Sequence, residues 1–264
     1  MNPYTYINTK KAIQKWWKKR KKWQKRLITS LVYIALVLSS LTFAIWFAFG
    51  RHNIVPVEDM TWGVTYSPLA SEGFDLNSDT VYSQVVKDLK PNKIRLAAYW
   101  NRIMPNSRTH DFSELDRQVD LASKHEIPIT LVVGRRVPRY PECHEPNWVE
   151  ELSVERQQAE LLKFMKQVIQ RYDDKQYLES WQIENEPFLG SFGDCPPLSE
   201  KFLEEEFALA RSLTKKNLIT TESGELSFWL KASKYPDVLG TTLYRRVLIQ
   251  GTNIAVNHIY PSWY

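Results

Sequence analysis

Residues 180–188 read SWQIENEPF, an apolar run that ends in two glutamates around an asparagine and stops at a proline. The apolar residues before the acids are typical of a buried strand, and Pro187 ends the ladder because it has no N–H to donate. If the strand continues through the acids, Glu184 and Glu186 lie on one face, since side chains two residues apart point the same way. The stretch therefore predicts a buried strand with carboxylates at its mouth.

Strand-like and helix-like segments alternate on both sides of this stretch. The expected strands are 62–68, 93–100, 128–134, 177–187, 218–223 and 238–246. The expected helices are 78–89, 112–126, 153–172, 198–216 and 227–234. Such alternation is typical of parallel strands flanked by helices, either in a barrel or in an open doubly wound sheet.

Two features favour the barrel. No glycine-rich phosphate-binding motif follows any expected strand, and carboxylates, arginines and aromatics gather at the carboxyl ends of several strands, where barrel active sites form. The six expected strands make an incomplete (β/α)8 TIM-type barrel, of class α/β, with six of its eight strand–helix units. Such an open barrel would expose unpaired strand edges and apolar inner faces.

The amino-terminal part of the chain has a different composition. Residues 1–26 hold ten of the 35 basic residues and no acidic one, so the remainder has 25 basic against 30 acidic residues. Residues 27–49 carry no charge, and a helix of that length crosses the roughly 30 Å hydrocarbon core of a bilayer. We expect a basic cytoplasmic tail, a transmembrane helix over 27–49, a linker over 50–60 and an extracytoplasmic barrel domain over 61–264, because positive charge stays on the cytoplasmic side.

Three alternatives apply to this part of the chain. Ala48-Phe49-Gly50 has small residues at signal-peptidase spacing, although the apolar run is longer than a usual signal-peptide core. A buried helix of a soluble protein is the second alternative. Nucleic-acid binding by KKRKKW (18–23) is the third; beside a membrane span, contact with anionic lipid is the expected use of such a run, so no nucleic-acid partner is predicted.

Cys143 and Cys195 are the two cysteines of the chain, and both follow the expected span. They fall in the loops after the third and fourth strands, which neighbouring strands bring side by side, so we expect a disulfide in an oxidising compartment. Two free thiols are the alternative. His144 lies beside Cys143, but no second ligand pair with zinc spacing exists, and neither a metal nor a cofactor is predicted.

Glu186 is the candidate proton donor of the chain. A carboxylic acid with apolar neighbours has a raised pKa and can donate a proton near neutrality. Cleavage of a glycosidic bond needs such an acid beside the leaving oxygen. A surface acid that caps the following helix is the alternative reading.

The NEP sequence at the end of a fourth strand resembles clan A of the retaining glycoside hydrolases, (β/α)8 barrels that include the cellulase-like family 5 and its relatives. The resemblance covers residues 61–264. It implies that Glu186 is the general acid/base and that Asn185 contacts the sugar 2-hydroxyl. It also implies that Arg95, in the second strand, orients the nucleophile, and it places Tyr244 near a position that assists the nucleophile.

The sequence departs from the clan at two places. The clan often has a histidine at the end of its third strand, where this chain has Gly134-Arg135-Arg136. The clan's nucleophile is a glutamate at the end of the seventh strand, whereas this chain ends with NHIYPSWY (257–264), after the expected sixth strand. We therefore expect a chain truncated after that strand, with the nucleophile in a missing C-terminal segment.

Further candidates follow from the needs of glycan cleavage. A retaining enzyme needs two carboxylates about 5–5.5 Å apart. Glu222 and Glu225, after the fifth strand, are possible second carboxylates, with substrate contact or a helix cap as alternative roles. Trp100 and Trp148 are candidate aromatic faces for a sugar, with core packing as the alternative.

The sequence thus predicts a membrane-anchored, extracytoplasmic glycoside hydrolase that cleaves a β-linked polysaccharide or oligosaccharide with retention. The alternative is an inactive glycan-binding or scaffold protein with a decayed barrel, which the missing strands and the absent third-strand histidine favour. A transporter is disfavoured because a single span offers no path across a membrane.

Overall fold

The computed structural model describes residues 15–49, 60–190, 192–227, 229–248, 252 and 254–257. The chain divides into two compact units, residues 1–57 with 260–264 and residues 58–259. Residues 1–14 of the predicted tail and nearly all of the predicted linker lie outside the described residues, as does Gly50 of the possible cleavage site.

The first unit contains the 28-residue helix α2 (Lys22–Phe49), within which the predicted span 27–49 falls. By length and composition, it is the one described helix that is apolar enough to cross a membrane. The hydroxyl groups of Thr29 and Thr42 donate hydrogen bonds to the carbonyl oxygens of Lys25 and Leu38, four residues earlier. These polar side chains are therefore satisfied within the helix, as a hydrocarbon environment would require.

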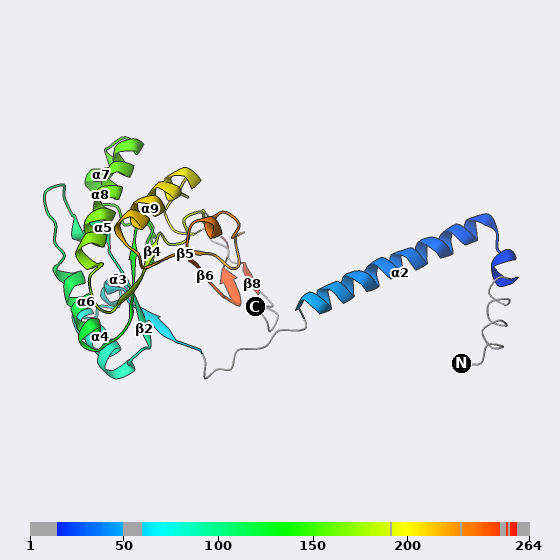
Figure 1. Ribbon diagram of the computed structural model, residues 1–264, viewed down its shortest axis with the longest axis horizontal. Helices are drawn as coiled ribbons and strands as arrows, with labels where there is room; N and C mark the ends of the chain where they lie inside the picture. The colour runs from blue at the N-terminus through cyan, green and yellow to red at the C-terminus, as the bar shows by residue number, and fades with distance from the viewer. Residues whose placement is uncertain are drawn as a thin grey trace. The chain divides into compact units, whose positions relative to one another are not determined.

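The second unit is built on six parallel strands that follow one another in chain order across a curled sheet (Figure 1). They are β1 (Gly63–Thr65), β2 (Lys93–Ala97), β3 (Ile129–Val133), β4 (Leu178–Ile183), β5 (Asn217–Glu222) and β6 (Val238–Thr241). Every neighbouring pair is parallel. The predicted fold class is confirmed, because this order and direction make an incomplete TIM barrel.

Helices connect the strands and cover the outer face of the sheet (Figure 1). They are α3 (Pro68–Glu72), α4 (Ser78–Gln84), the π-helical turn η2 (Val85–Leu89), α5 (Trp100–Ile103), α6 (Ser113–Lys124), α7 (Asn147–Glu150), α8 (Val154–Tyr172), α9 (Glu200–Leu213) and the 3-10 turn η3 (Ala232–Lys234). The expected helix over 227–234 is reduced to that last turn.

The expected sixth strand, 238–246, is wrong in its second half. β6 ends at Thr241, and Arg246 begins a separate strand, β7 (Arg246–Leu248), which pairs antiparallel with β8 (Ala255–Asn257). The break lies within VLGTTLYRR (238–246), a stretch rich in the β-branched, apolar and aromatic residues that favour extended backbone. The sequence pattern therefore marks extended backbone but not the point at which the chain leaves the sheet.

The main core lies between the outer face of the sheet and the helices. Leu131 of β3 and Trp181 of β4 are fully buried there against Phe164 and Tyr172 of α8. Burial of such a side chain contributes about 1.5–3 kcal/mol. The buried indole N–H of Trp181 has a hydrogen-bond partner, because it donates to Asp173 Oδ1 at 2.9 Å.

The inner face of the sheet carries polar side chains on its middle strands beside a buried apolar group that includes Ala97 and Val132, so the expected apolar inner face is present only in part. Thr130 and Ser180 share a hydrogen bond of 2.8 Å, and Arg95 Nη1 donates to Gln182 Oε1 at 3.0 Å. Arg95 Nε also donates to Thr65 Oγ1 at 2.9 Å. Buried polar groups are tolerated where they bond to one another; these bonds link β1 to β2 and β3 to β4, and the bond between Arg95 and Gln182 reaches across β3.

Candidate active site

The backbone turns sharply where β4 ends, and this turn separates the two predicted acids. Glu184 and Glu186 have positive φ angles, 60° and 48°, so the alternation of an extended strand stops at Ile183. The prediction that both acids share one face is wrong for that reason. Glu184 is fully buried, whereas Glu186 lines a cavity at the carboxyl ends of the strands.

Glu184 is a structural acid that holds the loop after β3. Its two carboxylate oxygens each accept a hydrogen bond of 2.6 Å, from the backbone N–H groups of Arg135 and Arg136. Gly134, at φ 147°, makes this approach possible, since a Cβ there would lie 2.4 Å from Glu184 Oε1. The Gly-Arg-Arg sequence at the end of β3 therefore provides backbone donors for a buried carboxylate.

Glu206 of α9 is a second fully buried acid beside Glu184. Burial and the charge of Glu184 raise the pKa of Glu206 well above its usual range. A neutral Glu206 beside an ionised Glu184 removes the repulsion between two buried charges. Neither acid of this pair lines the cavity.

The cavity at the carboxyl ends of the strands has a volume of about 900 Å³. β2, β4, β5, β6 or the loops that follow them contribute to its wall, as do the loop after β3 and strand β7. Among the predicted site residues it brings together Arg95, Asn185, Glu186, Glu225 and Tyr244. This end of a parallel barrel is the end at which active sites form.

Glu186 occupies the cavity wall with 8% of its surface exposed. Its carboxyl group accepts no hydrogen bond from any of the described residues, while its backbone N–H donates to Thr221 Oγ1 at 3.1 Å. Burial raises the pKa of Glu186 to about 7, and the charges of Glu142 and Glu222 act in the same direction. A carboxylic acid that is largely protonated just below neutral pH can donate a proton there.

Asn185 is held by a chain of hydrogen bonds that starts at Arg95. Gln182, which accepts from Arg95, donates through Nε2 to Asn185 Oδ1 at 3.2 Å. Thr221 Oγ1 donates to the same oxygen at 3.1 Å. Arg95 therefore lies at the same end of the sheet as Glu186 and acts on Asn185 through one intermediate side chain.

Glu142 is a site residue that the sequence reasoning missed. It follows β3 in the long loop before α7, is 4% exposed, and lines the same cavity as Glu186. Its Oε2 accepts a hydrogen bond of 2.9 Å from Asn185 Nδ2. The loop sequence RRVPRYPECHEPNW (135–148) has no periodic pattern, and Glu142 is one of its two acids, so only the fold distinguishes it from Glu145.

The two possible second carboxylates have different positions. Glu222 is 1% exposed, does not line the cavity, and accepts bonds from Phe188 N–H at 3.2 Å and Ser227 Oγ at 2.6 Å. Glu222 anchors the loop after β4, so the prediction that it reaches the cavity as a second carboxylate is wrong. Glu225 does line the cavity, but it accepts from Thr242 Oγ1 at 2.6 Å and from the backbone N–H of Tyr244.

The prediction that Trp100 and Trp148 offer aromatic faces to a sugar is also wrong. Trp100 is 1% exposed and stacks on Phe164 of α8 with ring centres 5.6 Å apart. Trp148 packs edge-on against Trp100 and donates its indole N–H to Met104 O at 3.0 Å. The helical turn α5 directs Trp100 into the core, and Trp148 is partly buried against that core. The aromatic side chains that line the cavity are Tyr140, Phe192 and Tyr244.

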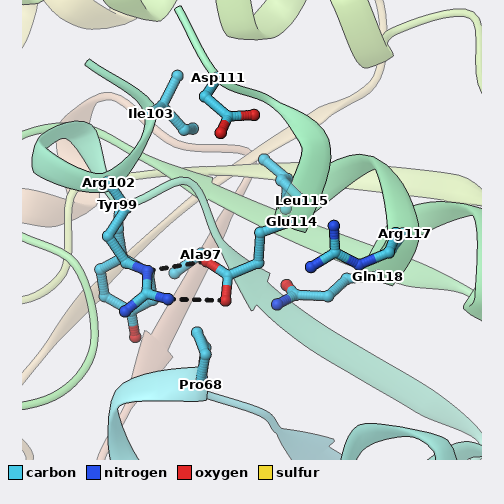
Figure 2. Close-up of a pocket in the computed structure, with 10 residues that line it drawn as sticks. All are labelled: Pro68, Ala97, Tyr99, Arg102, Ile103, Asp111, Glu114, Leu115, Arg117 and Gln118. Atoms are coloured by element: carbon cyan, nitrogen blue, oxygen red, sulfur yellow. Dashed lines mark hydrogen bonds and ion pairs between the residues drawn. The ribbon is translucent and has the colours of Figure 1, made fainter. Parts of the chain in front are cut away.

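A second, smaller cavity of about 180 Å³ lies beside α5 and α6 (Figure 2). In it the Arg102 guanidinium donates to both oxygens of Glu114, at 2.8 and 2.9 Å, as the dashed lines in Figure 2 show. It also donates to both oxygens of Glu72, at 2.9 and 3.0 Å. The charges here satisfy one another, so this cavity is a structural ion-pair cluster that joins α3, α5 and α6.

The predicted disulfide between Cys143 and Cys195 is present. It joins the loop after β3 to the loop after β4, with a Cα–Cα distance of 5.1 Å. Arg136, which is fully buried beside it, donates to Cys195 O at 2.6 Å and to Asn185 O at 3.2 Å. The two loops that carry Glu142 and Asn185 are thus fixed to each other by a covalent bond and by a buried guanidinium.

No group of three or more histidine, cysteine, aspartate or glutamate side chains that could hold a metal ion occurs in the described part of the chain.

No protein-family model and no curated protein matches the sequence. Solved structures do match, at low identity. One is a GH5_18 protein from Streptomyces cattleya in complex with Manb1-4GlcNAc, with 10% identity and a TM-score of 0.55 over 70% of this chain and 52% of that chain. Another is a β-galactosidase from the psychrophilic Marinomonas ef1, with 14% identity and a TM-score of 0.50 over 70% of this chain and 41% of that one.

A glycosylated endo-β-1,4-xylanase of family 10 from Gloeophyllum trabeum matches over 68% of this chain and 59% of that chain, with 16% identity and a TM-score of 0.49. The chain spans roughly half the length of these glycoside hydrolases. At such identity the likeness shows the fold alone, a glycosidase-like TIM-barrel fold.

Proposed function

We propose that the protein is a membrane-anchored glycoside hydrolase that acts outside the cytoplasm on a β-linked glycan, with retention of anomeric configuration. The single observation that carries the proposal is Glu186: a carboxyl group in the wall of a 900 Å³ cavity, with no hydrogen-bond partner among the described residues and a pKa raised to about 7. Glu186 donates its proton to the bridging oxygen of the glycan and later takes a proton from water.

Asn185 and Arg95 support this role of Glu186. Asn185 is fixed by Gln182 and Thr221, so its amide presents a defined edge to a sugar hydroxyl. Arg95 stabilises negative charge in the cavity, and it is held in place by Thr65 and Gln182. The glycosidase-like fold supports a saccharide partner. So does the similar structure from Streptomyces cattleya, which is in complex with Manb1-4GlcNAc.

The membrane anchor is part of the same proposal. The apolar part of helix α2, residues 27–49, follows ten basic residues, an order that keeps the amino terminus in the cytoplasm and exports the barrel. A disulfide in the barrel unit supports an oxidising, extracytoplasmic location. Labelling of an introduced cysteine by a membrane-impermeant thiol reagent in intact cells tests this orientation.

The activity is tested by hydrolysis of aryl β-glycosides and β-linked oligosaccharides by the full chain. Glu186→Gln should lower kcat/KM by about a thousandfold on oligosaccharides, because general acid catalysis contributes on the order of 10²–10⁴. The loss should be smaller on substrates with an acidic phenol as leaving group, which needs little protonation. Equal activity in wild type and Glu186→Gln contradicts the proposal. Saccharide binding without hydrolysis supports the glycan-binding alternative instead.

A further inference from the structure

Glu142 shares the cavity with Glu186 but comes from a different part of the chain, the loop between β3 and α7. A single hydrogen bond joins it to the residue before Glu186, since Asn185 Nδ2 donates to Glu142 Oε2 at 2.9 Å. Glu142 thus contacts the side chain of Asn185, and Glu186 is the next residue along the chain. Both acids line one cavity, as two carboxyl groups that act on the same glycosidic bond must.

The backbone holds Glu142 in place independently of that side-chain bond. Its N–H donates to Arg139 O at 2.8 Å, and its carbonyl accepts from Val137 N–H at 3.0 Å. The next residue, Cys143, is joined covalently to the loop after β4. Catalytic groups need such fixed geometry, because small displacements of a reacting group cost large factors in rate.

Gly193 in the loop after β4 also packs directly against this side chain. It has a φ of 80°, and a Cβ at that position would lie 2.8 Å from Glu142 Cγ. A residue with a side chain would therefore displace Glu142 or the loop. Both the glycine and the disulfide position the loop after β4 over Glu142, and that loop begins with Asn185 and Glu186.

The charges around the two carboxyl groups differ. Burial raises the pKa of Glu142, but hydrogen bonds from Asn185 and the Arg139 backbone and the charges of Arg136 and Arg95 oppose that rise. Glu186 has a raised pKa from burial and from the charges of Glu142, Glu222 and Glu225, with Arg136 acting against them. Hydrogen-bond donors and cations around Glu142 thus favour its ionised form, whereas the acids around Glu186 favour its protonated form.

We infer that Glu142 is the second carboxylate of the site and acts as its nucleophile, on an anomeric carbon positioned between Glu142 and Glu186. The inference rests on the proposed function and assigns to this chain the group that the clan resemblance places elsewhere. Glu222 is bonded outside the cavity, and Glu225 is engaged by Thr242 and by the Tyr244 backbone. Glu184 is enclosed by backbone donors.

The reaction has two balanced steps. First, a Glu142 oxygen forms a bond to the anomeric carbon while the bond from that carbon to the bridging oxygen breaks, and Glu186 gives its proton to that oxygen. Second, a water oxygen attacks the anomeric carbon as the ester bond to Glu142 breaks, and the water proton passes to Glu186. Both carboxyl groups return to their starting states, and one water is consumed per bond cleaved.

The test uses the full chain and a panel of 2,4-dinitrophenyl β-glycosides, with sodium azide as an external nucleophile. Glu142→Ala should lose on the order of a thousandfold or more in turnover, because removal of a nucleophile stops the first step. Azide should restore turnover and yield the α-glycosyl azide, since it takes the place of the carboxylate. Glu186→Ala should instead yield the β-glycosyl azide, since azide then attacks the ester to Glu142. The anomeric configuration is read by proton NMR.

Two further variants separate chemistry from folding. Glu142→Gln keeps an oxygen that accepts from Asn185, and it should retain the wild-type Tm while losing turnover. Glu151→Ala, at an exposed glutamate just after α7, should behave as wild type.

Wild-type turnover in Glu142→Ala, or a loss that azide does not rescue to the α-azide, overturns the inference. If Glu186→Ala still gives the β-azide in that case, the proposed function stands without Glu142. If the wild-type chain hydrolyses none of the panel, both are overturned.

Discussion

The two faces of the sheet differ in how their buried side chains are accommodated, by apolar packing on one and by hydrogen bonds on the other. On the outer face, Leu131 and Trp181 are fully buried among apolar neighbours from α8, with few polar contacts. On the inner face, Arg95, Thr130 and Gln182 are held by hydrogen bonds that cross from strand to strand. The same strands supply both sets, because successive side chains alternate between the faces.

This difference separates stability from chemistry. Apolar packing on the outer face is non-directional and accumulates with the area removed from water. The bonded inner face instead orients a few groups toward the cavity, and it leaves Glu186 with an ionisation cost that a purely structural residue would not carry. Variants on the two faces should therefore affect different measurements.

The largest effect on stability is expected from the outer face. Phe164→Ala removes a fully buried ring that stacks on Trp100, and it should lower the free energy of unfolding by about 4 kcal/mol, because it leaves a cavity in a packed core. Phe74→Ala, at a ring that is 76% exposed, should change it by less than about 0.5 kcal/mol. Denaturant titration of the barrel unit in the full chain compares the two. Similar values would contradict the expectation that apolar packing on the outer face stabilises the fold.

A pH-dependent effect of up to about 3 kcal/mol is expected from Glu186. Its folded pKa of about 7 lies above the ordinary value of 4.5, so the fold is favoured by the protonated form, and that contribution is lost as the pH rises through 7. Glu186→Gln, which cannot ionise, should be more stable than wild type at pH 8 and nearly equal to it at pH 4. Thermal unfolding at the two pH values measures the difference. A constant difference between the variants at both pH values would contradict the raised pKa.

A smaller loss of stability, about 2 kcal/mol, is expected from a substitution directly after β3. Gly134→Ala places a methyl group against the Glu184 carboxylate at a φ that side chains rarely adopt, so it should destabilise the fold. Gly73→Ala is the matched control, because Gly73 has an ordinary helical φ of −64° and its Cβ would meet only backbone oxygens at 3.3 Å or more. Equal urea midpoints for the two variants would show that the close approach at Gly134 is relieved at no cost.

Much of the fold could be predicted from the sequence, because period-two and period-3.6 patterns report directly on the outer face. The helices predicted over 112–126 and 153–172 agree with α6 and α8, and five of the strands fall where the apolar runs are. The polar inner face could not be predicted, because it depends on hydrogen bonds between strands far apart in the sequence. The hairpin β7–β8 was missed for a related reason: extended residues do not show which partner they pair with.

The site was predicted in part. Asn185, Glu186 and Arg95 meet in one cavity because strand ends are recognisable in the sequence and parallel strands end on one side. Glu142 was missed because an irregular loop carries no periodic signal. Trp100 was misplaced because a short helical turn after β2 directs it into the core, where Trp148 packs against it. The positive φ angles of Glu184 and Glu186 are not encoded by any glycine or asparagine at those positions.

The most direct test of the account is the ionisation of Glu186 itself. A carboxyl ¹³C NMR titration of the full chain in detergent micelles, with Glu186→Gln to identify the signal, gives its pKa without any assumption about substrate. The account predicts a midpoint near 7, from a side chain enclosed by the cavity wall and facing other acids. A midpoint near the ordinary value of 4.5 would show a solvated carboxylate that cannot serve as the proton donor.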